Sequence, residues 1–151
     1  MPDWHPDPSD GLRGDRLISE ALAPHAPEDG HPTDPGVYVL RCCSPGRSLH
    51  AHAQRWREAG YRDAHPDSLA RLADGTHLLY VGCARNVRVR IEDHVTGDRR
   101  RAAFVAAYPA FDVALVEWCA ADRRRVVERQ VADRLAYRHP EWAVWCDGVV
   151  R

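Results

Sequence analysis

Three short apolar runs along the chain have the composition of β-strands. They cover residues 36–43 (GVYVLRCC), 77–83 (HLLYVGC) and 111–118 (FDVALVEW). Short runs rich in Val, Leu and aromatic residues are typical of strands with at least one buried face. We therefore predict three strands, and we expect them to pair with one another.

A clear helical period follows Asn86, a residue type that commonly caps helix N-termini. Val87, Ile91 and Val95 then recur at four-residue intervals, which places them in one stripe along a helix. The pattern predicts a helix that ends near residue 95, with this stripe turned toward the sheet.

A second repeat of this kind predicts the strongest helix of the chain, over residues 122–137. Val127, Val131 and Leu135 form its apolar stripe, Asp122 is its expected cap, and Pro140 lies just beyond it. Weaker helical patterns cover residues 15–23, 49–59, 67–73 and 98–107, the last with Asp98 as its expected cap.

These elements predict an α+β fold, with a small three-stranded antiparallel sheet flanked by helices. The stretch between the first two strands is too long for a hairpin loop. We therefore expect residues 44–76 to form a helical insertion.

Residues 1–35 are predicted to form an acidic, proline-rich arm ahead of a domain spanning residues 36–151. Residues 1–40 carry eight acidic residues and two arginines, a formal charge of −6, whereas the remainder carries 19 arginines and 14 acids, or +5. Two roles for the arm remain open. It either lies over the basic surface and competes with nucleic acid, or packs an apolar patch of Leu17, Ile18 and Leu22 to complete the core.

Cysteine content and hydropathy bear on the location of the protein. The five cysteines are an odd number, and no secretory signal pattern begins the chain, so reduced thiols are expected. No run approaches the ~20 apolar residues of a membrane span. We therefore expect a soluble cytoplasmic protein with no membrane partner, while the sequence carries no signal of oligomeric state.

Two tripeptides, Gly36-Val37-Tyr38 and Tyr80-Val81-Gly82, place a tyrosine in each of the first two predicted strands. If these strands pair, both phenols come to one place. At about 100° per residue, Arg90 lies about 60° and His94 about 20° from Val87 around the helix axis. Both therefore border the stripe that is expected to face the tyrosines.

Taken singly, each of these side chains has an ordinary structural explanation. The tyrosines fit sheet aromatics with exposed hydroxyls, Arg90 a solvated helix surface, and His94 the last turn of a helix. Glu128 fits an i, i+4 partner of Arg124. As an ordered set, however, they are more specific than any one of them.

The set resembles the GIY-YIG nuclease family, with valine in place of isoleucine at positions 37 and 81, over roughly residues 36–140. The resemblance implies metal-dependent hydrolysis of DNA phosphodiester bonds by an endonuclease. It implies catalytic roles for Tyr38, Tyr80, Arg90, His94 and Glu128, with Glu128 also the ligand of a single divalent metal, Mg²⁺ or Mn²⁺.

Departures from the family pattern keep a second hypothesis open. Cys83 and Ala84 stand where a basic or hydroxyl residue is common. Many relatives carry an asparagine after the glutamate-bearing helix, but Asn86 is the only asparagine of this chain. The alternative is a nucleic-acid-binding module of the same fold that is catalytically weak or inactive.

Arginine clusters supply candidate contacts to nucleic-acid phosphates, although a solvated surface explains them equally well. The candidates are Arg85, Arg88, Arg99, Arg100, Arg101 and Arg124. A zinc site is a more distant hypothesis, because the cysteines and histidines at 42, 43, 50, 52 and 83 lack the spacing of zinc ligands.

Overall fold

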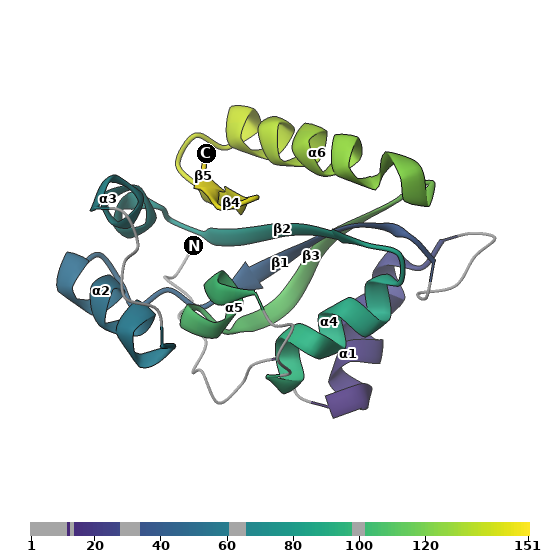
Figure 1. Ribbon diagram of the computed structural model, residues 1–151, viewed down its shortest axis with the longest axis horizontal. Helices are drawn as coiled ribbons and strands as arrows, with labels where there is room; N and C mark the ends of the chain where they lie inside the picture. Colours follow the sequence, from purple (N-terminus) through teal and green to yellow (C-terminus); the bar gives the residue numbers. More distant parts are fainter. Residues whose placement is uncertain (1–11, 13, 28–33, 61–65, 98–101) are drawn as a thin grey trace.

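A mixed five-stranded sheet with the strand order β3-β1-β2-β4-β5 lies at the centre of the computed structural model (Figure 1). The structure describes residues 12, 14–27, 34–60, 66–97 and 102–151. The strands are β1 (Gly36–Cys42), β2 (Leu78–Ala84), β3 (Ala110–Trp118), β4 (Ala143–Cys146) and β5 (Val149–Val150). β1 is antiparallel to both β2 and β3, whereas β4 runs parallel to β2.

The predicted three-stranded antiparallel sheet is therefore wrong, although the α+β class agrees with the structure. The three predicted strands are present as β1, β2 and β3. The two that were missed, β4 and β5, contain four and two residues. Runs this short carry little sequence pattern, and the pairing of β4 with β2 joins segments far apart in the chain.

The predicted helices are also present, and one of the three expected caps is confirmed and one is wrong. The helical elements are α1 (Gly14–Leu22), η2 (Ala23–His25), α2 (Leu49–Glu58), α3 (Pro66–Asp74), α4 (Val87–Thr96), α5 (Ala103–Ala107), η3 (Ala121–Arg123) and α6 (Arg124–Arg138). The Asn86 side chain accepts a hydrogen bond from the Val89 amide at 3.0 Å, as expected of a cap. The cap assigned to Asp122 is wrong, because that residue lies in the 3₁₀ turn and α6 begins after it without a side-chain cap. Asp98 lies outside the described residues.

Alternate residues of the central strands point to opposite faces of the sheet. Tyr38 and Leu40 belong to the core cluster that includes Ile91 of α4, whereas Val37 and Val39 pack in the cluster of α6. Figure 1 shows α6 along one face of the sheet and α1, α4 and α5 along the other. The first two strands therefore contribute to both cores.

The segment between β1 and β2 forms α2 and α3, and both helices support the rest of the fold. Trp56 of α2 is buried and packs edge-on against Phe104, with ring centroids 6.3 Å apart. Arg71 of α3 donates hydrogen bonds to three backbone carbonyls of the C-terminal segment, those of Pro140, Trp142 and Arg151, at 3.1–3.3 Å. The insertion thus holds the β4–β5 hairpin in place.

α1 packs against α4 and belongs to the core. Its Ile18 and Leu22 side chains are buried in the same cluster as Ile91. Arg88 of α4 donates a 2.8 Å hydrogen bond to the hydroxyl of Ser19. This part of the predicted arm therefore has a structural role, while residues 1–11 and 28–33 lie outside the described residues. None of the helices in the described segments has the length and apolar character needed to cross a membrane.

Candidate active site

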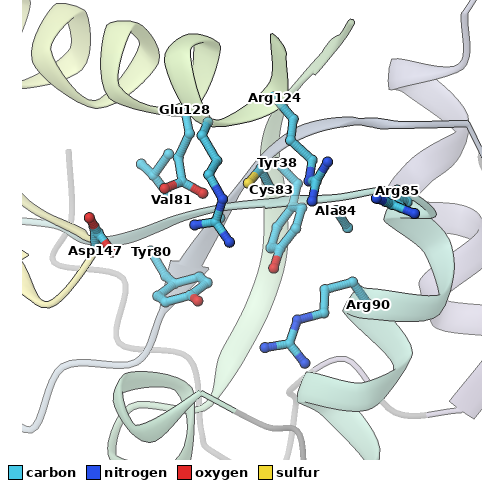
Figure 2. A pocket seen from close by; sticks show the side chains of 12 residues that line it. Tyr38, Tyr80, Val81, Cys83, Ala84, Arg85, Arg90, Arg124, Glu128 and Asp147 are labelled. Atoms are coloured by element: carbon cyan, nitrogen blue, oxygen red, sulfur yellow. The ribbon is translucent and has the colours of Figure 1, made fainter. Parts of the chain in front are cut away.

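A pocket of about 360 Å³ opens at the C-terminal end of β2. Its walls come from β1, β2, α4, α6 and the turn after β4 (Figure 2). It is lined by Tyr38, Tyr80, Val81, Gly82, Cys83, Ala84, Arg85, Arg90, Arg124, Arg125, Glu128 and Asp147. Four arginines, two carboxylates and two phenols therefore surround one small cavity.

An open stretch of strand edge allows side chains from both faces of the sheet to reach this pocket. β4 pairs with β2 only as far as Val81, which lies opposite Cys146. Beyond that point, residues 82–84 pair with β1 but have no strand on their other side among the described residues. The tyrosines approach this edge from the face covered by α4, and Glu128 approaches from α6 on the opposite face (Figure 2).

Glycine at position 82 makes room for the first tyrosine. Gly82 lies opposite Tyr38 in the β1–β2 register, and a Cβ atom added there would lie 2.6 Å from the ring carbon that carries the Tyr38 hydroxyl. It would also lie 2.9 Å from the Tyr80 ring. The glycine of the second tripeptide is thus explained by the way the two tyrosines pack, with ring centroids 6.3 Å apart.

His94 lies behind the two phenols and does not line the pocket. Its side chain is buried, with a relative exposure of 1%. Its Nε2 atom is 2.8 Å from the Tyr38 hydroxyl, and its Nδ1 accepts a 3.3 Å hydrogen bond from the backbone amide of Ala102. The ring also makes an edge contact with Tyr80, with centroids 5.2 Å apart.

Both tyrosines are harder to ionise than a tyrosine in water. Burial raises the pKa of Tyr38 well above its usual value of 10.0, and the neighbouring Tyr80 adds to this increase. Burial likewise raises the pKa of Tyr80 to about 12. The Arg90 guanidinium acts in the opposite direction on both pKa values. Burial outweighs the effect of Arg90, so both phenols are protonated at neutral pH.

Two of the four pocket arginines already form contacts with neighbouring residues. Arg90 is 3.8 Å from a carboxylate oxygen of Asp93, and Arg124 donates a 2.6 Å hydrogen bond to the Ala121 carbonyl. Arg85 and Arg125 form no hydrogen bond or ion pair with another described residue. These two guanidiniums can therefore bind an anion without first breaking a contact within the described part of the fold.

The other predicted nucleic-acid contacts lie elsewhere. Arg88 does not line the pocket, because its guanidinium pairs with Glu92 at 3.1 Å and binds Ser19 of α1. The cluster at residues 99–101 lies outside the described residues. Of the six predicted contact residues, Arg85 and Arg124 line the pocket.

Glu128 lies near the N-terminal end of α6, beside the thiols of Cys83 and Cys146. Cys146 donates a long 3.7 Å hydrogen bond to its Oε1 atom. Burial and then the Glu128 carboxylate raise the pKa of both Cys83 and Cys146 to about 12. The thiols therefore stay protonated, and weak thiol donors leave the carboxylate oxygens available to a stronger partner.

These residues fit a hydrated hard cation better than a metal enclosed by protein ligands. Among the described residues, no group of three or more His, Cys, Asp or Glu side chains is placed to hold a metal ion. Mg²⁺ usually keeps several waters and binds through one or two carboxylates together with substrate phosphates. Glu128 and Asp147 line the pocket beside four arginines, so the donor set suits such an ion.

Sequence reasoning missed Asp147 and Arg125 as residues of this site. Asp147 and Gly148 have φ angles of +52° and +78°, typical of the Asp-Gly pair in a tight hairpin turn. That dipeptide after the apolar run at 143–146 is a signal from which the hairpin could have been predicted. Asp147 reaches the pocket only because the hairpin docks beside β2.

The structure brings together most of the predicted constellation. Tyr38, Tyr80, Arg90 and Glu128 line one pocket, and His94 supports Tyr38 from behind. Comparison of the chain with family models, curated proteins and solved structures finds no match.

Proposed function

We propose that this chain is a metal-dependent endonuclease that hydrolyses DNA phosphodiester bonds. One observation carries the proposal: Tyr38, Tyr80, Arg90 and Glu128 come from four separate elements and line a single pocket. Phosphodiester hydrolysis needs a positioned water, positive charge around the phosphoryl group and help for the departing oxygen. This set of side chains can meet all three needs, and it supports the resemblance to GIY-YIG nucleases.

The arginines bind and orient the phosphate in this proposal. Arg90 offers a planar pair of donors to the non-bridging oxygens, and Arg85 and Arg125 widen the cationic wall. Glu128 would hold a hydrated Mg²⁺ or Mn²⁺, and Asp147 lines the same pocket as a second carboxylate. When bound, the ion supplies positive charge at the phosphate and makes a coordinated water more acidic.

A tyrosine, Tyr38 or Tyr80, takes the proton of the attacking water. A phenol can act as a base only when it is ionised, and burial raises the pKa of both tyrosines. The ionised fraction of either phenol therefore grows as the pH rises. We expect cleavage to accelerate from neutral to alkaline pH, up to the point at which the fold itself fails.

The same pKa values favour a second candidate function, a nucleic-acid-binding module with little or no turnover. The free protein has both phenols protonated, and the chain lacks the asparagine of many relatives. The arginines of the pocket serve phosphate binding in either case. The five free cysteines suit a reducing compartment, so a cytoplasmic location is part of both proposals.

One experiment separates the two functions. Plasmid, branched duplex and single-stranded DNA are incubated with the protein, with and without Mg²⁺, and both cleavage and binding are measured. Glu128→Gln removes the charge that would hold the ion, and Glu58→Gln, an exposed glutamate of α2, is the matched control. Mg²⁺-dependent cleavage that Glu128→Gln alone abolishes supports the nuclease. Binding to any of these substrates without cleavage supports the module, and cleavage that Glu128→Gln leaves unchanged refutes the proposed site.

A further inference from the structure

Two hydrogen bonds that His94 forms with described residues indicate the position of its ring proton. A backbone amide can only donate, so the Nδ1 atom that receives the Ala102 N–H presents a lone pair and carries no proton. The neutral imidazole therefore carries its single proton on Nε2. Because Nε2 is 2.8 Å from the Tyr38 oxygen, this N–H donates to the phenol, and the phenol oxygen accepts.

We propose that His94 is a positioning residue that donates a permanent hydrogen bond to Tyr38, and that it is not the base that deprotonates this tyrosine. Accepting the phenol proton would require a free lone pair on the ring. The Nε2 atom already carries a proton, and protonating Nδ1 would break the bond with the Ala102 amide. The buried ring offers no third site.

The Tyr38 hydroxyl proton must then point away from His94. Tyr38 lines the pocket, so the pocket is the open direction for this proton. The titratable and charged groups that face the Tyr38 oxygen are Tyr80 and Cys83 of β2 and Arg90 and His94 of α4. After the proton has left, the Nε2–H donor and the Arg90 guanidinium both stabilise the phenolate.

The hydrogen bond from Ala102 links the start of α5 to Tyr38 of β1 through His94. Ala102 immediately precedes α5, and its amide bond holds the His94 ring in a single tautomer. Tyr80 makes an edge contact with the same ring, so both phenols are oriented by one side chain. The role of Tyr38 as a proton acceptor rests on the proposed function, whereas the tautomer of His94 does not.

Nitrogen NMR of the imidazole rings tests the tautomer without any assay of activity. The full-length protein is labelled with ¹⁵N-histidine, and the His94 signals are assigned by comparison with His94→Gln. We expect a protonated Nε2 and an unprotonated Nδ1 in the folded protein at neutral pH. A protonated Nδ1, with or without a proton on Nε2, overturns the proposal.

Replacement of the donor tests its effect on Tyr38. His94→Gln keeps an N–H group that can reach the phenol, whereas His94→Phe keeps the ring but loses the donor. The ionisation of Tyr38 is followed by ultraviolet absorbance, with Tyr38→Phe identifying its signal. We expect His94→Phe to move this ionisation upward by about one pH unit, a tenfold loss of phenolate at a given pH, and His94→Gln to move it less.

The nuclease assay adds a second readout if the chain cleaves DNA. The alkaline rise in rate should move upward with His94→Phe by the same interval. A uniform loss of rate with no shift in either profile, in a variant that melts cooperatively, would show a merely structural role and refute the proposal. NMR reports on the tautomer of His94 directly. The tautomer result therefore holds even if the protein shows no nuclease activity.

Discussion

A Cβ atom at Gly82 would lie 2.5 Å from the hydroxyl oxygen of Tyr38. Tyr38 cannot swing outward to avoid it, because the ring is only 1% exposed. The Tyr38 ring therefore packs over position 82 of the paired strands, and a side chain at that position would displace it.

Gly82→Ala should consequently damage the site more than the fold. The added methyl must push the Tyr38 oxygen away from His94, and a misplacement of about 1 Å can lower a rate by about 100-fold. The cost of overpacking should be about 1–3 kcal/mol of unfolding free energy. Cleavage assays and thermal melts measure both effects. Gly60→Ala is the control, because its φ of +89° makes this substitution destabilising too, while Gly60 does not line the pocket. It should lower stability and spare activity; equal losses of activity in both variants would contradict this explanation.

Arg125 should contribute to nucleic-acid affinity through charge alone. Its guanidinium lines the pocket and has no partner among the described residues. Arg125→Ala should weaken binding to all sequences alike and lower the slope of log affinity against log salt by about one. Titrations at several salt concentrations give this slope. Arg134 lies on the same helix, but its side chain pairs with Glu117 of β3, so Arg134→Ala should leave this slope unchanged.

Asp147 should strengthen cation binding beside Glu128. Both carboxylates line the pocket, and removal of one charge weakens attraction for a divalent ion at a site shared with four arginines. Asp147→Asn should lower Mn²⁺ affinity several-fold in a calorimetric titration. Asp133→Asn should not, because Asp133 is exposed, pairs with Arg151 and does not line the pocket. An unchanged affinity would leave Glu128 as the sole carboxylate concerned.

Acid should destabilise the protein through His52. Burial lowers the pKa of this histidine. The hydrogen bond to the Gly46 carbonyl raises the pKa, and the charge of Arg55 lowers it further. The ring is completely buried and accepts from the Tyr108 hydroxyl while donating to the Gly46 carbonyl. The unfolded chain thus binds a proton more readily than the folded one, so the stability contribution is complete above the unfolded pKa of about 6.5 and is lost as the pH falls below it.

The loss should approach about 1.4 kcal/mol per pH unit between the unfolded and folded pKa values. Denaturant melts at pH 5 to 8 measure it. His52→Gln should flatten this dependence, whereas His50→Gln, exposed on the same helix, should preserve it. The same slope in all three proteins would assign the acid sensitivity to other groups.

Ile18 tests whether the N-terminal helix is part of the core. The side chain is fully buried in the cluster of α4, so Ile18→Ala should cost about 2–5 kcal/mol of unfolding free energy. Leu49→Ala, which changes an exposed leucine, should cost far less. If Ile18→Ala instead leaves the melt unchanged and tightens DNA binding at low salt, the arm competes with nucleic acid and its packing is secondary.

The sequence predicted the elements that carry strong periodicity and missed those that depend on distant partners. The stripe of Val87 and Ile91 identified α4 and the face beside which Arg90 and His94 lie. Val87 and Ile91 are both buried, as predicted. The strand at 143–146 is short and mostly buried on both faces, so its residues do not alternate between apolar and polar. Its position depends on distant partners, the parallel strand β2 and Arg71 of the insertion. Asp147 could not be placed in the site without that strand.

The helical wheel placed Arg90 and His94 together beside the stripe and did not distinguish their surroundings. Arg90 reaches the pocket, and His94, one turn further, is enclosed behind the tyrosines. Its partner Ala102 follows a run of arginines and is the N-cap of a short helix, with no side-chain cap hydrogen bond. No local pattern predicts a backbone amide as the partner of a histidine, so the tautomer required the structure.

The parallel pairing of β4 with β2 has a consequence for the growing chain. Domains form as units while synthesis proceeds from the N-terminus, and non-local strand pairs close late. The tyrosines, Arg85 and Arg90 precede residue 91, whereas Glu128 and Asp147 follow much later. During translation the pocket therefore acquires its phenols and first arginines well before its carboxylates, and the acidic half of the site is the last to be assembled.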